Sequence, residues 1–74
     1  MTIDEVKKLI EAGIPDAHAT VRDLTGTNDH FAAVVISPAF HGKSVLEMHR
    51  MVYAALGAAM KGPIHALQLE TRAP

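Results

Sequence analysis

The stretch that decides the fold runs from Phe40 to Tyr53, FHGKSVLEMHRMVY. Ser44 and Glu47 have the spacing of a capping box, in which each side chain accepts a hydrogen bond from the other residue's amide. Apolar residues then recur every three or four positions and predict a helix from Ser44 to about Lys61, with this buried stripe: Val45, Met48, Val52 and Leu56. The Gly42–Lys43 turn before the cap is compatible with an anion contact, a partner contact or a plain helix entrance.

Length and composition indicate one small domain, residues 1–74. Of the 74 residues 49% are apolar, and the formal net charge is −1. Such a chain builds only a small core. It has no Cys, so disulfides, Cys-based metal sites and Cys nucleophiles are excluded. Its N-terminus, MTIDEVKK, is charged, unlike a secretory signal, and no apolar run is long enough to span a bilayer. We therefore expect a soluble cytoplasmic protein with no membrane contact.

A second capping box, Thr2 with Glu5, begins a predicted helix over residues 3–12, and Gly13 and Pro15 end it. In the later helix, Gly57 favours a bend or an early end, because an internal Gly costs about 1 kcal/mol relative to Ala.

Three segments have the pattern of β-strands. The first and last alternate apolar with polar residues, whereas the middle one is continuously apolar, as in a central strand. They are residues 17–24, 31–36 and 64–71. The connector 25–29 consists of turn residues, and Gly26 and Asn28 in it can adopt positive φ.

The α-β-β-α-β order predicts an α+β fold with a three-stranded mixed sheet and both helices on one face. A short link makes the first two strands antiparallel, and a helical crossover makes the last strand parallel to the middle one. His30 and His65 then stand at the starts of parallel strands, with their backbones roughly 5–10 Å apart. Two imidazoles can converge on one metal ion from there if the register permits.

The sequence resembles the BolA family from the first helix to Leu69. The residues that carry the resemblance are Phe40, Gly42, Lys43, Ser44, His49, Arg50, Val52, Tyr53, Ile64, His65 and Ala66. The resemblance implies a fold like that of type II KH domains, in agreement with the order of elements.

The resemblance also implies a non-enzymatic partner of a monothiol glutaredoxin. Such pairs share a [2Fe–2S] cluster, bound also by glutathione and the glutaredoxin Cys, for cluster transfer or for iron and redox sensing in iron homeostasis and the stress response. His65 is the ligand that the resemblance assigns to the last strand, and no cofactor is expected in the isolated chain. The resemblance further implies a second ligand, which relatives often take from the connector between the first two strands. Here residues 25–29 contain neither Cys nor His, so His30 is the nearest candidate.

Two other functions fit the sequence. A KH-like nucleic-acid-binding transcriptional regulator would bind DNA, although the chain lacks a basic excess and the Gly-x-x-Gly clamp of KH domains. A metal-free interaction module would use the exposed face of the second helix. A homodimer is also compatible with the sequence. The residues assigned to a partner or nucleic-acid surface are Phe40, Gly42, Lys43, His49 and Arg50.

The other histidines and the serines suggest no further chemistry. His18 and His41 are expected to be solvated, and His49 is an ordinary helix residue or part of the partner surface. No two histidines have the i, i+4 spacing of a helical zinc site. Ser37 and Ser44 are the only serines, and Ser44 is needed as a cap, so we expect no catalytic residues.

Overall fold

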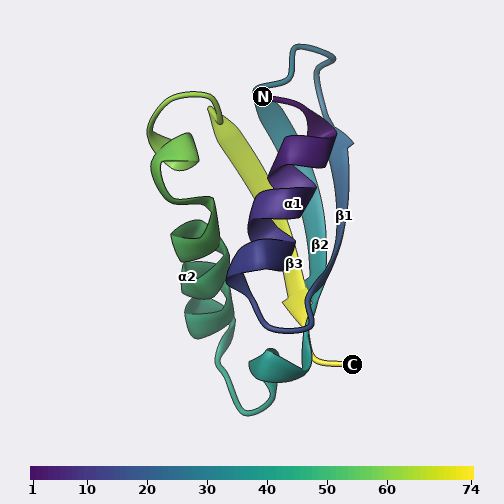
Figure 1. The fold of residues 1–74 in the computed structure, drawn as a ribbon, viewed down its shortest axis with the longest axis vertical. Helices are drawn as coiled ribbons and strands as arrows, with labels where there is room; N and C mark the ends of the chain where they lie inside the picture. The colour runs from purple at the N-terminus through teal and green to yellow at the C-terminus, as the bar shows by residue number, and fades with distance from the viewer.

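The chain folds in the predicted α-β-β-α-β order, with two short 3₁₀ turns added (Figure 1). The computed structural model describes residues 1–74. Its elements are α1 (Ile3–Gly13), β1 (His18–Asp23), β2 (His30–Ile36), η1 (Pro38–Phe40), α2 (Val45–Leu56), η2 (Gly57–Lys61) and β3 (Ala66–Arg72). Both ends of α1, β1 and β2 fall within one residue of the predicted positions. None of the helices combines the length and the apolar character needed to cross a membrane.

Both predicted capping boxes are present. The Thr2 hydroxyl accepts the Glu5 amide at 3.1 Å, and the Glu5 carboxylate accepts the Thr2 amide at 2.9 Å. Ser44 and Glu47 make the same two bonds, at 3.1 and 3.2 Å, at the start of α2. Each pair satisfies amides that a helix N-terminus otherwise leaves without a partner.

The sheet is mixed, as predicted, with the strand order β1-β2-β3. β1 is antiparallel to β2, and β2 is parallel to β3 with His30 opposite Ala66. Figure 1 shows α1 and α2 on the same side of this sheet. The starts of β2 and β3 therefore lie at one rim, beside the β1–β2 loop and the N-terminus.

The core lies between the helices and the sheet face they cover. Alternate side chains of β1 and β2 are buried there. The core residues of the strands and helices are Val6, Ile10, Ala19, Val21, Phe31, Ala33, Val35, Met48, Val52 and Leu56. On the opposite face of the sheet, Thr20, Arg22, Gln68 and Glu70 are exposed.

The second helix is shorter than predicted. α2 ends at Leu56, and the chain continues to Lys61 as the 3₁₀ turn η2. Gly57 has φ +55°, which is incompatible with a right-handed helix, and its amide donates to the Tyr53 carbonyl as a C-cap. The prediction of a continuous helix to Lys61 was wrong, whereas the predicted early end at Gly57 is confirmed.

Two further details differ from the prediction because of tertiary packing. β3 begins at Ala66 rather than Ile64, since Ile64 is 2% exposed in the core and its amide donates to the Ala59 carbonyl at 2.9 Å. Val45, the first residue predicted for the buried stripe of α2, is 63% exposed. The buried stripe starts one turn later, at Met48.

Candidate metal centre

His30 and His65 lie side by side at the rim where β2 and β3 begin. His30 opens β2 opposite Ala66, and His65 immediately precedes Ala66. The centres of the two imidazole rings are 5.8 Å apart, and the ring planes are inclined at 35°. The predicted proximity of these histidines is confirmed, and the parallel pairing of β2 with β3 is its cause.

The main chain of Asp29 ties the two strand starts together. Its carbonyl oxygen accepts the His65 amide at 2.7 Å and the Ala66 amide at 3.3 Å. Because Asp29 directly precedes His30, this bifurcated bond fixes the backbone of His65 relative to that of His30. These backbone hydrogen bonds therefore hold the two main-chain positions from which the imidazole rings extend.

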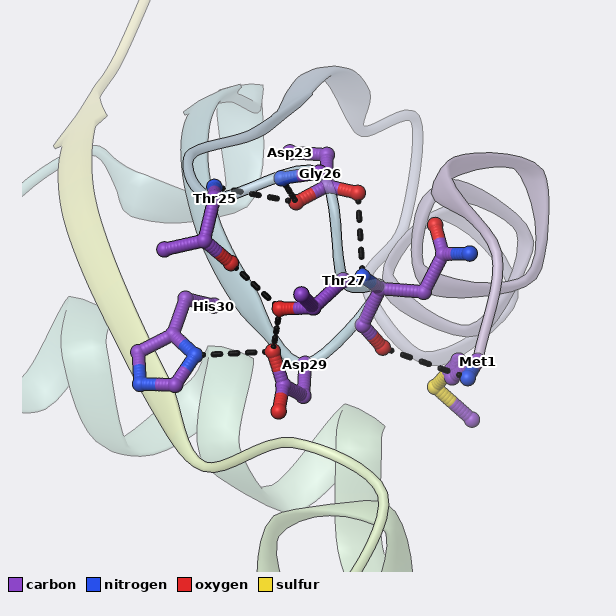
Figure 2. A network of polar contacts seen from close by, with 8 residues as sticks. Met1, Asp23, Thr25, Gly26, Thr27, Asp29 and His30 are labelled. Carbon is purple, nitrogen blue, oxygen red and sulfur yellow. Dashed lines mark hydrogen bonds and ion pairs between the residues drawn. The ribbon is translucent and has the colours of Figure 1, made fainter.

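The side chain of Asp29 contacts His30 directly (Figure 2). Its Oδ1 lies 2.8 Å from Nδ1 of His30, and the same oxygen accepts a hydrogen bond from the Thr27 hydroxyl. These two bonds, with that of Thr27 the stronger influence, lower the pKa of Asp29 from 3.8 to about 2. Hydrogen bonds to a carboxylate favour its ionised form, so Asp29 is an anion next to His30 at neutral pH.

The β1–β2 loop that carries Asp29 is held by a second carboxylate. Asp23 accepts the amides of Thr25 at 3.2 Å, Gly26 at 3.0 Å and Asn28 at 3.0 Å (Figure 2). Gly26 and Asn28 have the predicted positive φ, at +75° and +58°. The N-terminal amine of Met1 donates to the Asn28 carbonyl at 3.3 Å. The loop is therefore a hydrogen-bonded turn that fixes the position of the Asp29 backbone.

The histidine pair fits a metal that takes two imidazole ligands. Two imidazoles on one tetrahedral ion, with metal–nitrogen bonds of about 2.0–2.1 Å, have ring centres about 5 Å apart. The observed 5.8 Å is close enough for side-chain rotation to close the gap. The chain has no group of three or more His, Cys, Asp or Glu residues arranged to hold a metal ion. A four-coordinate metal bound to this pair would thus complete its coordination with groups from other molecules.

Both candidate ligands can be reached from solvent. The His30 side chain is 39% exposed, and His65 is also exposed. His18 and His41 are exposed as predicted, and the His18 side chain, which is 90% exposed, has its Nδ1 3.9 Å from Glu11. His18 and His41 belong to other parts of the fold, on β1 and after η1.

The five residues predicted for a partner or nucleic-acid surface differ in their exposure to solvent. Gly42, with φ +76°, Lys43 and Arg50 are exposed, and His49 is half-buried on α2. Phe40 is only 2% exposed, so its assignment to this surface was wrong. The turn η1 directs the Phe40 ring into the core, because an aromatic side chain gains most from burial.

The N-terminus of α2 already contains an anion. The Glu47 carboxylate accepts the Ser44 amide, and this hydrogen bond lowers the pKa of Glu47. An internal carboxylate therefore provides the negative charge that a helix N-terminus favours. This arrangement supports a plain helix entrance over an external anion site at Gly42 and Lys43.

Two features that bear on function were missed in the sequence. One is Asp29, which the sequence could have indicated because its carboxylate directly precedes a candidate ligand, His30. The other is the apolar character of the exposed face of α2, which was predicted only as the surface of a metal-free interaction module. On this face Leu46 is 59% and Tyr53 is 41% exposed. Because these residues lie seven positions apart, they fall on one side of the helix, and Arg50 lies between them.

Comparisons with known proteins agree on one family. The family model described as BolA-like protein matches residues 12–74. The solved structure of a bolA protein homologue from Coxiella burnetii has a TM-score of 0.86 and 40% sequence identity, over 100% of this chain and 92% of that chain.

Two curated relatives match over part of the chain. Human BolA-like protein 1 is 45% identical over 49 residues, which make up 66% of this chain and 36% of that protein. The Escherichia coli (strain K12) protein named DNA-binding transcriptional regulator BolA is 39% identical over 46 residues, 62% of this chain and 44% of the relative. The matched segments thus span less than half of either relative's length. With its fold and the match over residues 12–74, the chain belongs to the BolA family.

Proposed function

We propose that this protein is a non-enzymatic accessory protein that shares a [2Fe–2S] cluster with a monothiol glutaredoxin. The observation that supports it most is the pair His30 and His65, with ring centres 5.8 Å apart at an accessible rim. These two residues would be its ligands to the cluster. The Cys of the glutaredoxin and glutathione would bind the other iron.

Two imidazoles suit a cluster that is passed on or sensed. A [2Fe–2S] cluster with two His ligands on one iron has a higher reduction potential than one held by four thiolates. On this chain, protonation of His30 or His65 would remove the lone pair that binds iron. Acidification would therefore weaken the hold of this protein on the cluster, which is useful for release to a client.

The role assigned to the partner follows from what the chain can supply. A tetrahedral iron needs four ligands, and a [2Fe–2S] cluster takes four ligands besides its sulfides. The two histidines supply two ligands in either count. The chain contains no Cys to provide thiolates. A partner with a reactive Cys would add the missing type of ligand, and the exposed Leu46, Arg50 and Tyr53 offer a surface for it on α2.

The proposal is tested by anaerobic reconstitution with a monothiol glutaredoxin, iron, sulfide and glutathione. The visible absorption and circular dichroism spectra of the glutaredoxin cluster should change when this protein is added. His65→Ala should abolish or alter that change. The matched control is His41→Ala, which removes another exposed imidazole and should behave like the parent protein. An unchanged spectrum with the parent protein, or equal spectra for His65→Ala and the parent, would contradict the proposal.

A second candidate function is DNA binding by a transcriptional regulator. It is supported by the name of the Escherichia coli relative and by two exposed cations, Lys43 just before α2 and Arg50 in the middle of that helix. The formal net charge of −1 offers little of the attraction on which phosphate binding depends. A salt titration of binding to duplex DNA tests this function, and the absence of salt-dependent affinity near physiological ionic strength would exclude it.

A further inference from the structure

Asp29 contacts both candidate ligands, one with its side chain and the other with its main chain. Oδ1 lies 2.8 Å from Nδ1 of His30, and the carbonyl oxygen accepts the His65 amide at 2.7 Å. These contacts are chemically separate. Asp29→Ala removes the first contact and keeps the second, since every residue has a backbone carbonyl.

The contact with His30 determines where the imidazole carries its proton. An ionised carboxylate can only accept hydrogen bonds, so Nδ1 of His30 has to donate. A neutral imidazole has a single N–H, and Nε2 is then left with a free lone pair. In Figure 2 this second ring nitrogen points away from Asp29, and it is the atom available to a metal.

We propose that Asp29 is a positioning residue for this centre, which holds the His30 proton on Nδ1 and presents Nε2 as the metal ligand. This inference rests on the proposed function for the identity of the metal group. Its first half, the state of the His30 ring, concerns the isolated protein and is independent of any metal.

The surrounding loop keeps the Asp29 carboxylate in place. The Thr27 hydroxyl donates to the same oxygen that faces His30, and the Asp23 carboxylate holds the turn through three backbone amides. An acceptor fixed in this way orients the ring and selects its tautomer. The loss of such a partner typically lowers metal affinity or activity by about 10- to 100-fold.

The first test uses ¹⁵N NMR of the isolated protein at alkaline pH, where imidazoles are neutral. His30 should show a protonated Nδ1 and an unprotonated Nε2, whereas a His without such an acceptor carries its proton mainly on Nε2. Asp29→Ala should move the His30 proton to Nε2. Asp29→Asn retains an acceptor oxygen and should largely preserve the parent pattern. The control Glu70→Gln, which removes one negative charge from an exposed side chain on β3, should leave His30 unchanged. An Nε2–H form in the parent, or no change in Asp29→Ala, would overturn the inference.

The second test measures cluster loss from the complex with the glutaredoxin under a fixed excess of iron chelator. Asp29→Ala should lose the cluster about 10-fold faster or more, and Glu70→Gln should match the parent. Equal rates for Asp29→Ala and the parent would overturn the role toward the metal. If the parent itself binds no cluster, the proposed function fails and the metal-facing half of the inference fails with it. The NMR experiment still decides whether Asp29 positions His30.

Discussion

The replacement of Phe40 by Ala separates a core role from a surface role for the turn that precedes α2. Phe40 is 2% exposed and belongs to the main hydrophobic cluster. Removal of a buried Phe side chain costs about 3–5 kcal/mol, from lost apolar burial and from the cavity left behind. A chain of 74 residues has a free energy of unfolding of roughly 4–11 kcal/mol. Phe40→Ala is therefore expected to remove a large share of the stability.

Urea denaturation followed by far-UV circular dichroism measures this loss. The midpoint should fall while the slope with urea stays the same, since a changed slope would indicate a different unfolded or native state. The matched control is Leu46→Ala, because Leu46 is 59% exposed on α2 and surface changes usually stay within about 0.5 kcal/mol. Phe40→Leu keeps most of the apolar volume and should fall between Phe40→Ala and the parent. If Phe40→Ala and Leu46→Ala are equally stable, the burial argument is wrong.

Three further predictions concern contacts elsewhere in the chain. Ser37→Ala should lower the free energy of unfolding by about 1–3 kcal/mol. The fully buried Ser37 hydroxyl donates to the Pro15 carbonyl at 2.6 Å and accepts the Ala39 amide at 3.1 Å. A loss of stability within experimental error in urea denaturation would contradict this prediction. A Cβ on Gly13 would lie 2.6 Å from Cβ of Ala55. Gly13→Ala should therefore destabilise the protein, since overpacking costs about 1–3 kcal/mol against a helix-propensity gain of at most about 1, and a raised melting temperature would disprove it. The folded pKa of Asp29 lies below its unfolded value, at about 2 instead of 3.8. Its contribution to stability is thus full above the unfolded pKa and lost as the pH falls through about 2, and an NMR titration of its carboxyl carbon with an ordinary midpoint would refute the interaction.

The features that the sequence predicted well are those set by near neighbours in the chain. Both capping boxes depend on residues three positions apart, and the positive φ of Gly26 and Asn28 on the residue types themselves. The parallel pairing of β2 with β3 followed from the helical crossover. This pairing was enough to predict from the sequence that His30 and His65 lie close together.

The errors arose where tertiary packing decides the outcome. The periodicity of α2 put Val45 on the buried stripe, but the first turn of the helix extends beyond the core. Phe40 stood in a motif with exposed neighbours, yet η1 turns its side chain inward. The link between Asp29 and His30 depends on the exact path of the loop, which no local pattern specifies. The role of His30 and His65 as ligands stays a prediction.

The central claim is that His30 and His65 bind iron directly, and pulsed electron paramagnetic resonance tests it. The chain would be labelled with ¹⁵N only in its histidines, combined with unlabelled glutaredoxin and glutathione around a [2Fe–2S] cluster, and reduced. We predict strong hyperfine couplings from two ¹⁵N nuclei, of which His65→Ala and His30→Ala each remove one while His41→Ala removes none. A spectrum of the parent complex without strongly coupled ¹⁵N would contradict the account.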